Sequence, residues 1–303
     1  MLAAECFSVR TLVTTHAMNQ RKDFRFFDRL RVRWAEVDMQ KIVFNGHYLL
    51  YFDTAVAGYW RAMALPYQAT LEHLDGDLYV RKATLEYHAS ARFEDQLDVG
   101  IRTARIGNSS MALECAVFRG DQLLVSGELL YVFANPATQT SLPVPPALRA
   151  VLLGFESGQA MLEVRLGAWD EQGGAAGAIR RQVFIEEQLV PAELECDDAD
   201  ALGLHAVVYN RFGLALATGR LLQHATGVAK IGRMAVMASM RGSGIGRALL
   251  DSLTDAARAR GDREVLLHAQ TAAAPFYLRA GFVARGKVFE EAGIAHIEML
   301  RLL

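Results

Sequence analysis

The chain has 303 residues, enough for two domains of ordinary size, and 52% of them are hydrophobic against 22% charged, as in globular proteins. The formal net charge of −2 gives no reason to expect nucleic acid or an acidic membrane as a partner. Three scattered cysteines, without metal-type spacing, argue against a disulfide framework or a metal site and favour the reducing cytoplasm. No apolar run reaches membrane-spanning length.

The first half of the chain reads as one helix followed by strands. Residues 1–22 lack the apolar core of a secretory signal and are predicted to form a disordered tail. Residues 26–34 alternate apolar and charged side chains, as a strand does, and residues 47–64 place apolar side chains on one face of a long helix. Four more strands are expected, at 78–87, 96–106, 110–119 and 122–133. This order predicts an α+β domain with an antiparallel sheet.

The second half begins after three prolines within residues 142–146, which mark a domain edge. A short helix at 147–155 is expected to bridge to a segment in which strands and helices alternate. Its predicted elements are a strand at 161–169, a helix at 175–188, a loop at 189–200, strands at 204–209, 214–223 and 228–237, a helix from Gly244, and strands at 264–269 and 296–302. The predicted organisation is a tail (1–22), a first domain (23–141), a linker (142–158) and a second domain (159–303).

A glycine-rich turn connects the strand at 228–237 to the helix from Gly244. The helix carries Ile245, Leu249, Leu253 and Ala256 on one face, and Gly261 is its expected C-cap. Glycines let backbone N–H groups approach an anion, and the first turn of a helix offers unpaired donors. The segment therefore predicts a phosphate-binding site formed by Arg241, Gly242, Ser243, Gly244, Ile245, Gly246 and Arg247.

The spacing within this turn narrows the choice of phosphate ligand. A Walker loop is excluded because its lysine is missing, and Arg247 stands where a dinucleotide-binding fingerprint has its third glycine. The pattern Arg-x-x-Gly-x-Gly, formed by Arg241, Gly244 and Gly246, resembles the acyl-CoA loop of GNAT acetyltransferases. Residues 274–282 are similar to the Phe-Tyr-x-x-x-Gly-Phe segment of that family. The resemblance implies an α/β domain with a mixed sheet that uses acetyl-CoA.

The GNAT resemblance also implies roles for individual residues. The backbone of Met234, Ala235 and Val236 is expected to hold the pantetheine arm and the acyl carbonyl, and Tyr277 to protonate the departing thiolate. The alternative for Tyr277 is an aromatic core residue. The base stays unassigned, with His205, His268 and Glu187 as candidates and Gln270 placed to face the cofactor.

An acidic segment lies near the expected acceptor side of this domain. It contains Glu186, Glu187, Glu193, Glu195, Asp197, Asp198 and Asp200. A solvated loop is the first interpretation of such a charge run. The alternative is that the segment attracts a cationic amine.

In the first half, Glu36 and Asp38 precede the long helix. A carboxylate there can simply cap the helix or face solvent. The surrounding segment resembles hotdog-fold thioesterases of the 4-hydroxybenzoyl-CoA thioesterase type, with matches at Asp38, Ile42, Val43, His47 and Tyr48. The resemblance implies that Asp38 is nucleophile or general base on a CoA thioester, with His47 and Tyr48 at the substrate. The family's glycine after the aspartate is Lys41 here, which leaves the loop geometry open because lysine adopts a positive φ less readily.

Together the two resemblances predict a fusion of a hotdog domain and a GNAT domain. The expected activities are acyl-CoA hydrolysis in the first half and acetyl transfer to a small-molecule or peptide amine in the second. The alternative is an acetyltransferase whose hotdog half is a non-catalytic acyl-CoA-binding or dimerisation module. A homo-oligomer through the hotdog domain is implied by analogy alone. No metal cofactor is expected, because the cysteines lack metal-type spacing.

Overall fold

The computed structural model describes residues 20–195 and 197–303. The predicted tail therefore lies outside the described residues, apart from its last three. These begin a short 3₁₀ turn, Arg21–Asp23, and the Arg21 guanidinium lies 2.7 Å from the Asp98 carboxylate. Cys6 and Cys196 also lie outside the described residues, and Cys115 is buried.

The described residues form two compact units. The first contains residues up to Tyr59 together with Leu78–Ala134, and the second contains Trp60–Asp77 and Asn135–Leu303. Trp60–Asp77, predicted as part of the first domain, thus belongs to the second unit.

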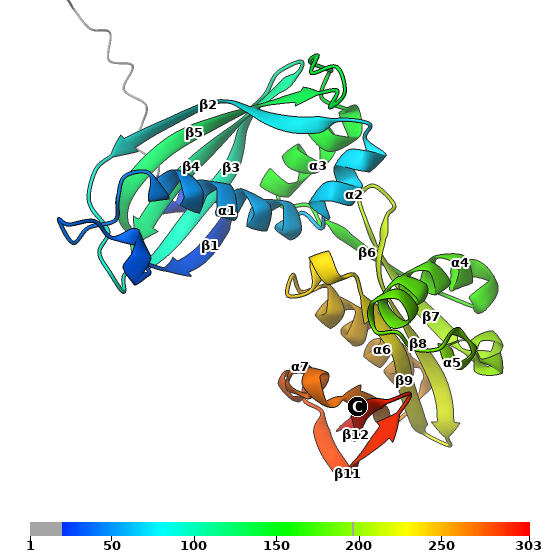
Figure 1. Cartoon of the computed structure of the whole chain (residues 1–303). Coiled ribbons are helices and arrows are strands. Elements are labelled where there is room, and N and C mark those ends of the chain that lie inside the picture. The colour runs from blue at the N-terminus through cyan, green and yellow to red at the C-terminus, as the bar shows by residue number, and fades with distance from the viewer. Residues whose placement is uncertain (1–19, 196) are drawn as a thin grey trace, which may run out of the picture. The chain divides into compact units, whose positions relative to one another are not determined.

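The first unit is an antiparallel sheet with a long helix on one face (Figure 1). Its elements are β1 (Phe26–Arg31), α1 (His47–Ala62), β2 (Asp77–Tyr87), β3 (Gln96–Ile106), β4 (Ser110–Arg119) and β5 (Gln122–Ala134). The sheet order is β1-β3-β4-β5-β2, so β2 lies at an edge. Helix α1 packs closely on the sheet: a Cβ added at Gly127 in β5 would lie 2.8 Å from the Phe52 ring. The predicted hotdog architecture is confirmed.

The second unit is built on a mixed sheet of seven strands in the order β11-β12-β10-β9-β8-β7-β6. The strands are β6 (Leu162–Gly167), β7 (Leu204–Asn210), β8 (Ala215–Ala225), β9 (Val228–Val236), β10 (Glu264–Gln270), β11 (Val283–Glu291) and β12 (Ile294–Leu302). The helices are α2 (Tyr67–His73), α3 (Pro146–Glu156), α4 (Trp169–Arg180), α5 (Ala192–Glu195), α6 (Ile245–Arg260) and α7 (Ala274–Arg279). Strands β9 and β10 pair in parallel, and the crossover helix α6 connects them. This confirms the predicted mixed α/β domain.

Helix α4 begins six residues earlier than predicted. Trp169, expected to end a strand, is its first residue, because the Glu171 carboxylate accepts the Ala168 N–H at 3.1 Å and caps the helix. Gly173 makes room for the Trp169 ring, since a Cβ there would lie 2.7 Å from it. The helix continues as a π-helical turn, Arg181–Glu187, and so ends one residue before the predicted end at 188.

Four helices or strands were not predicted: α2, α5, α7 and β11. The three helices have seven, four and six residues, too few for a helical period to show in the sequence. Strand β11 lies at an edge of the sheet and is mostly exposed, so it lacks the alternation of a half-buried strand. Within the two described ranges, no helix combines the length and apolar composition needed to cross a membrane.

Candidate functional site

The glycine-rich turn opens helix α6 as predicted. Gly242 and Gly244 have φ angles of 82° and 86°, a left-handed conformation that glycine adopts without steric cost. Gly244 is the N-cap of α6, and Gly261, at φ 92°, is the predicted C-cap. On the buried face of α6, Ala257 takes the place expected for Ala256, which is only half-buried.

The amides of this turn divide into two groups. Within the described part of the chain, four have no hydrogen-bond acceptor: those of Gly242, Gly244, Ile245 and Gly246. The other three bond carbonyls of the turn itself: those of Arg241, Ser243 and Arg247. The Ser243 hydroxyl also donates inward, to the Met240 carbonyl at 2.6 Å. Four free N–H groups at a helix N-terminus form a site that an anion such as a diphosphate can occupy.

Both arginines of the turn face carboxylates. The Arg241 guanidinium donates to both Glu187 oxygens, at 2.6 and 2.7 Å, and its Nε donates to the Val236 carbonyl at 3.1 Å. Arg247 Nε lies 2.9 and 2.8 Å from the Asp251 carboxylate oxygens, one helical turn further along α6. All four charged side chains are about half exposed. Neither arginine is buried, so neither is held in its ion pair by surrounding side chains.

Strands β9 and β10 separate beside this turn. Their parallel pairing runs only from Val228 with Glu264 to Ile231 with Leu267. A bulge follows in β9, where Arg233 has φ 52° and the register against β8 shifts. The edge of β9 that faces β10 is therefore unpaired over residues 232–236, the segment predicted to hold pantetheine. An extended ligand arm that carries amide groups can pair with such an edge.

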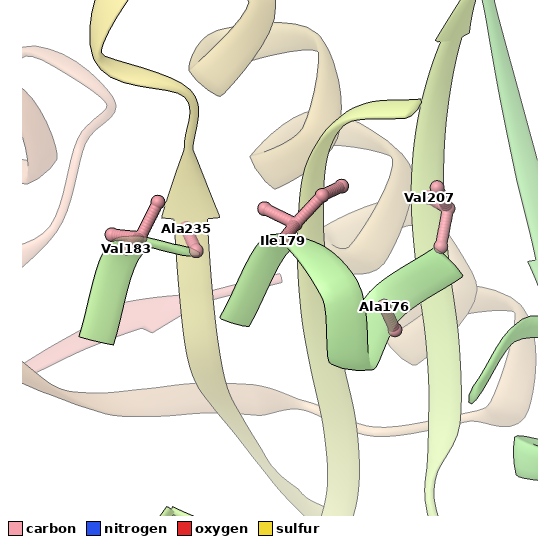
Figure 2. Close-up of a cluster of buried hydrophobic side chains, with 5 residues drawn as sticks. All are labelled: Ala176, Ile179, Val183, Val207 and Ala235. Atoms are coloured by element: carbon pink, nitrogen blue, oxygen red, sulfur yellow. The ribbon is translucent and has the colours of Figure 1, made fainter. Parts of the chain in front are cut away.

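The end of β9 is fixed by packing on both faces. Ala235 lies in a buried cluster on the α4 side (Figure 2), with Ala176, Ile179, Val183 and Val207. Met234 and Val236 point to the opposite face, as alternation requires. There, a Cβ at Gly219 would meet the Met234 sulfur at 2.9 Å, and one at Gly246 would meet Val236 at 3.5 Å.

Tyr277 lies on α7 and is only 8% exposed. Its ring contacts those of Phe276 and Phe282, with centroids 4.9 and 5.9 Å apart. Burial raises the pKa of Tyr277 to about 12, so the phenol keeps its proton at neutral pH. The packing agrees with a core aromatic, and the retained proton agrees with a general acid.

All three predicted base candidates have partners in the fold, and that of Glu187 is Arg241, as described above. His205 is 1% exposed and its Nε2 lies 2.9 Å from the Asp200 carbonyl. His268 Nδ1 lies 3.2 Å from the Glu291 carboxylate. Gln270, at the end of β10, donates to the Gln188 side-chain oxygen at 2.9 Å.

The interpretation of the acidic segment as a solvated loop is wrong for Glu195 and Asp200, which are only 4% and 5% exposed. Asp200 accepts hydrogen bonds from Arg180, at 2.8 and 3.0 Å, and from Arg220, at 2.6 Å. Glu195 accepts from the Arg180 Nε. Burial raises the pKa of Asp200, but the hydrogen bonds from both arginines outweigh that effect and lower it.

Asp197 extends this group by accepting from Arg220 and from Arg233 at 3.0 Å. We call the six residues the buried ion network: Arg180, Glu195, Asp197, Asp200, Arg220 and Arg233. It neutralises three of the seven acidic side chains, which weakens the alternative that the segment attracts a cationic amine. The sequence carried one signal of it: Arg220 is the one arginine, lysine or acidic residue of β8, and a charge buried in a strand needs a partner.

In the first unit, Asp38 lies in a tight loop before α1. Its N–H donates to the Ile42 carbonyl at 2.9 Å, and its carboxylate accepts the Gln40 N–H at 2.8 Å. Val37 and Val43 close the loop by an antiparallel bridge. Asp38 is half-buried, so its carboxylate remains accessible.

Lys41 adopts φ 63°, the left-handed conformation of the glycine that it replaces. The left-handed turn is therefore present here, at a steric cost of about 1–2 kcal/mol for a residue with a Cβ. This answers the question that the sequence left open about the loop geometry.

Glu36 anchors the same loop to α1. It is 3% exposed and accepts hydrogen bonds from the Arg33 N–H at 2.7 Å, the Arg33 Nε at 2.7 Å and the Tyr51 hydroxyl at 2.8 Å. Burial raises the pKa of Glu36, but these donors outweigh burial and lower it, so the group stays charged. The sequence did not distinguish this structural carboxylate from Asp38.

His47 and Tyr48 begin α1, but only His47 is accessible. The Tyr48 side chain is 2% exposed, and its hydroxyl accepts the Ala91 N–H at 3.0 Å. His47 is half-buried, with its ring centroid 6.0 Å from that of Phe44. Of the two predicted substrate contacts, Tyr48 is thus engaged in the fold, and His47 is partly exposed.

Comparison with known proteins matches each half separately. Residues 171–303 match the model of the acetyltransferase (GNAT) domain, and residues 40–126 match that of the thioesterase superfamily. The uncharacterized N-acetyltransferase YjcF of Bacillus subtilis is 37% identical over 133 residues, which cover 44% of this chain and 94% of the relative.

Solved structures also align with each half. An acyl-CoA N-acyltransferase from Pseudomonas aeruginosa is 32% identical, with a TM-score of 0.42, and the alignment covers 46% of this chain and 99% of that one. A 1,4-dihydroxy-2-naphthoyl-CoA thioesterase from Synechocystis is 18% identical, with a TM-score of 0.40, covering 42% and 95%.

The two family models agree with the two architectures described above, and the Bacillus relative agrees with that of the second unit. The chain belongs to the GNAT acetyltransferase family through its C-terminal half, to which a thioesterase-superfamily hotdog domain is fused at the N-terminal side.

Proposed function

We propose that the C-terminal half transfers the acetyl group of acetyl-CoA to an amine. The observation that carries this proposal is the set of four free amides at the start of α6, which adjoins the unpaired edge of β9. The turn supplies donors for the diphosphate, and the strand edge supplies backbone groups for the pantetheine arm. The proposed binding residues are Met234, Ala235, Val236, Arg241, Gly242, Ser243, Gly244, Ile245, Gly246 and Arg247.

In this reaction the amine nitrogen attacks the acetyl carbon, and a C–N bond forms as the C–S bond breaks. A backbone N–H at the end of β9 stabilises the oxygen anion that develops on the carbonyl. The thiolate takes the proton of Tyr277, which burial keeps protonated.

For the N-terminal half we propose hydrolysis of an acyl-CoA thioester, with Asp38 as nucleophile or general base. The support is an accessible carboxylate in a loop that keeps its left-handed turn and is anchored by buried Glu36. In this proposal the first-turn amides of α1 polarise the thioester carbonyl, and His47 contacts the substrate.

A non-catalytic acyl-CoA-binding or dimerisation module is the second candidate for this half. Exposed apolar side chains favour this second candidate, because Trp34, Met39 and Phe93 are 75%, 99% and 44% exposed. Strand β2, at an edge of the sheet, is also largely exposed, and a second copy can cover such an edge. Either function agrees with domains at 23–141 and 159–303, joined by residues 142–158, and with a homo-oligomer.

Gly244→Asp tests the acetyl-CoA site. A Cβ at φ 86° strains the N-cap, and the new carboxylate repels the diphosphate, so we expect acetyl-CoA affinity at this site to fall by about 10- to 100-fold. Calorimetry of the intact chain measures this. Thioester hydrolysis by the other half serves as the control and should not change. Unaltered acetyl-CoA affinity would contradict the assignment.

Tyr277→Phe tests the general acid. A thiolate is a weak base and leaves without full protonation, so we expect turnover to fall by only about tenfold, below the usual range for an acid. CoA affinity should hardly change, because the ring packing is kept. Equal losses of turnover and affinity, or no loss, would make Tyr277 a core residue instead.

A further inference from the structure

The ion pair of Glu187 with Arg241 joins two parts of the proposed acetyl-transfer site. Glu187 is the last residue of the π-helical turn, and Arg241 belongs to the phosphate-binding turn, 54 positions later. The contact is bidentate, at 2.6 and 2.7 Å, yet the two side chains are 40% and 43% exposed. An ion pair this exposed to solvent contributes little to stability, so a ligand can open it.

A bound diphosphate would compete directly with Glu187. Arginine binds phosphate and carboxylate with the same two-pronged geometry. The Nε of Arg241 is held by the Val236 carbonyl at 3.1 Å, which fixes the stem of the side chain at the end of β9. The two Nη atoms of Arg241 donate to Glu187, and these atoms can donate to a phosphate instead.

Glu187 also lies where the strands separate. Its neighbour Gln188 is bonded to Gln270 at the end of β10, and its partner Arg241 is bonded to the end of β9. The carboxylate is therefore held between two strand ends whose unpaired edge would receive the thioester. Strand β9 contains no carboxylate, and the single one in β10, Glu264, is at its opposite end.

We propose that the diphosphate of CoA displaces Glu187 from Arg241, and that the released carboxylate accepts the proton of the acceptor amine. This rests on the acetyl transfer proposed above. As the C–N bond forms and the C–S bond breaks, the nitrogen's proton passes to a Glu187 oxygen and the sulfur takes the proton of Tyr277. Glu187 then loses its proton to water and Tyr277 regains one, leaving an acetylated amine and free CoA.

Displacement also changes the basicity of Glu187. The hydrogen bond from Arg241 holds the pKa of Glu187 below its ordinary value, and the charge of Arg241 acts in the same direction. Paired, the carboxylate is a poor proton acceptor. Release raises its pKa, so the base becomes effective only after CoA has bound.

Glu187→Gln in the intact chain tests both parts of the proposal, with Glu186→Gln as the matched control. Glu186 is the exposed neighbour on the same turn and makes no ion pair within the described ranges. CoA affinity is measured by calorimetry as the binding that Gly244→Asp removes. Acetyl transfer is measured on the most reactive member of a panel of primary amines.

We expect Glu187→Gln to bind CoA about two- to fivefold more tightly, the range of an exposed ion pair, because the competing carboxylate is gone. Its kcat should fall by about 100-fold because the proton acceptor is missing. Glu186→Gln should match the wild type in both. In an Arg241→Gln background, Glu187→Gln should no longer affect CoA affinity, because the contested guanidinium is absent.

Tighter binding with lower turnover is the opposite of what a structural role predicts, since local unfolding weakens both. Unchanged or weaker CoA binding by Glu187→Gln overturns the displacement, and unchanged kcat overturns the proton-acceptor role. A wild type that binds no CoA at this turn, or acetylates no amine of the panel, instead overturns the acetyl transfer on which the proposal rests.

Discussion

Asp38→Asn is expected to lower thioester hydrolysis by about 10²- to 10⁴-fold, the usual contribution of a positioned base. Asparagine keeps the size of the side chain and an oxygen that can accept the Gln40 N–H, now at 2.8 Å, so the loop should persist. It removes the charge that a nucleophile or base requires. Release of free CoA from a panel of acyl-CoAs measures the effect, and oligomer size and thermal unfolding report whether folding is retained.

The matched control is Asp53→Asn, an exposed carboxylate on α1, which should hydrolyse acyl-CoA like the wild type. Lys41→Gly should do the same, because the lysine already adopts φ 63° and the loop geometry does not depend on glycine. Greater hydrolysis by Lys41→Gly would mean that the lysine impairs the site. A wild type that binds an acyl-CoA without releasing CoA, and an asparagine variant that binds it equally well, would establish the non-catalytic module instead.

Asp200→Asn is expected to destabilise the GNAT domain by about 3–5 kcal/mol, the cost of breaking a buried ion pair from one side. Asp200 is 5% exposed and bonds both Arg180 and Arg220, which are themselves 1% and 5% exposed. When the Asp200 charge is removed, the two buried guanidinium groups keep only Glu195 and Asp197 as charged partners. This is a large part of the 5–15 kcal/mol by which a typical domain is stable.

Denaturant unfolding of the intact chain combines the unfolding of two domains, so it does not isolate the stability of one of them. Hydrogen exchange measures the protection of individual strands, here β7, β8 and β9, which adjoin the buried ion network. Asp198→Asn is the control, since Asp198 is exposed on the same 3₁₀ turn and should change protection by less than about 0.5 kcal/mol. Equal protection of these strands in Asp200→Asn and wild type would show that the network adds no net stability.

The same residue predicts a pH dependence with a definite sign. The pKa of Asp200 is lowered in the folded state, so its contribution is present above the unfolded pKa of about 4 and is lost as pH falls through the lower, folded value. The stability difference between wild type and Asp200→Asn should therefore be constant near neutral pH and shrink in strong acid. A difference that grows on acidification would contradict the lowered pKa.

The sequence by itself determined both architectures and the place of the phosphate-binding turn. Its signals were local: apolar periodicity for α1 and α6, turn residues between β3, β4 and β5, and glycines at 242, 244 and 261 that have positive φ in the structure. A glycine at such a position reports a backbone requirement that depends on immediate neighbours alone. These features were therefore readable without knowing what packs against them.

Only the tertiary structure decided which charged residues are free to act. In the sequence, Glu195 and Asp200 look like Asp198, and Glu36 looks like Asp38. Their difference arises from partners far away in the chain: Arg220 closes the buried ion network on Asp200 from β8, and Tyr51 holds Glu36 from α1. Long-range pairing sets burial, and burial decides whether a carboxylate stabilises the fold or meets a substrate. For the same reason, the contact of Glu187 with Arg241 became visible only once the π-helical turn and the phosphate-binding turn were side by side.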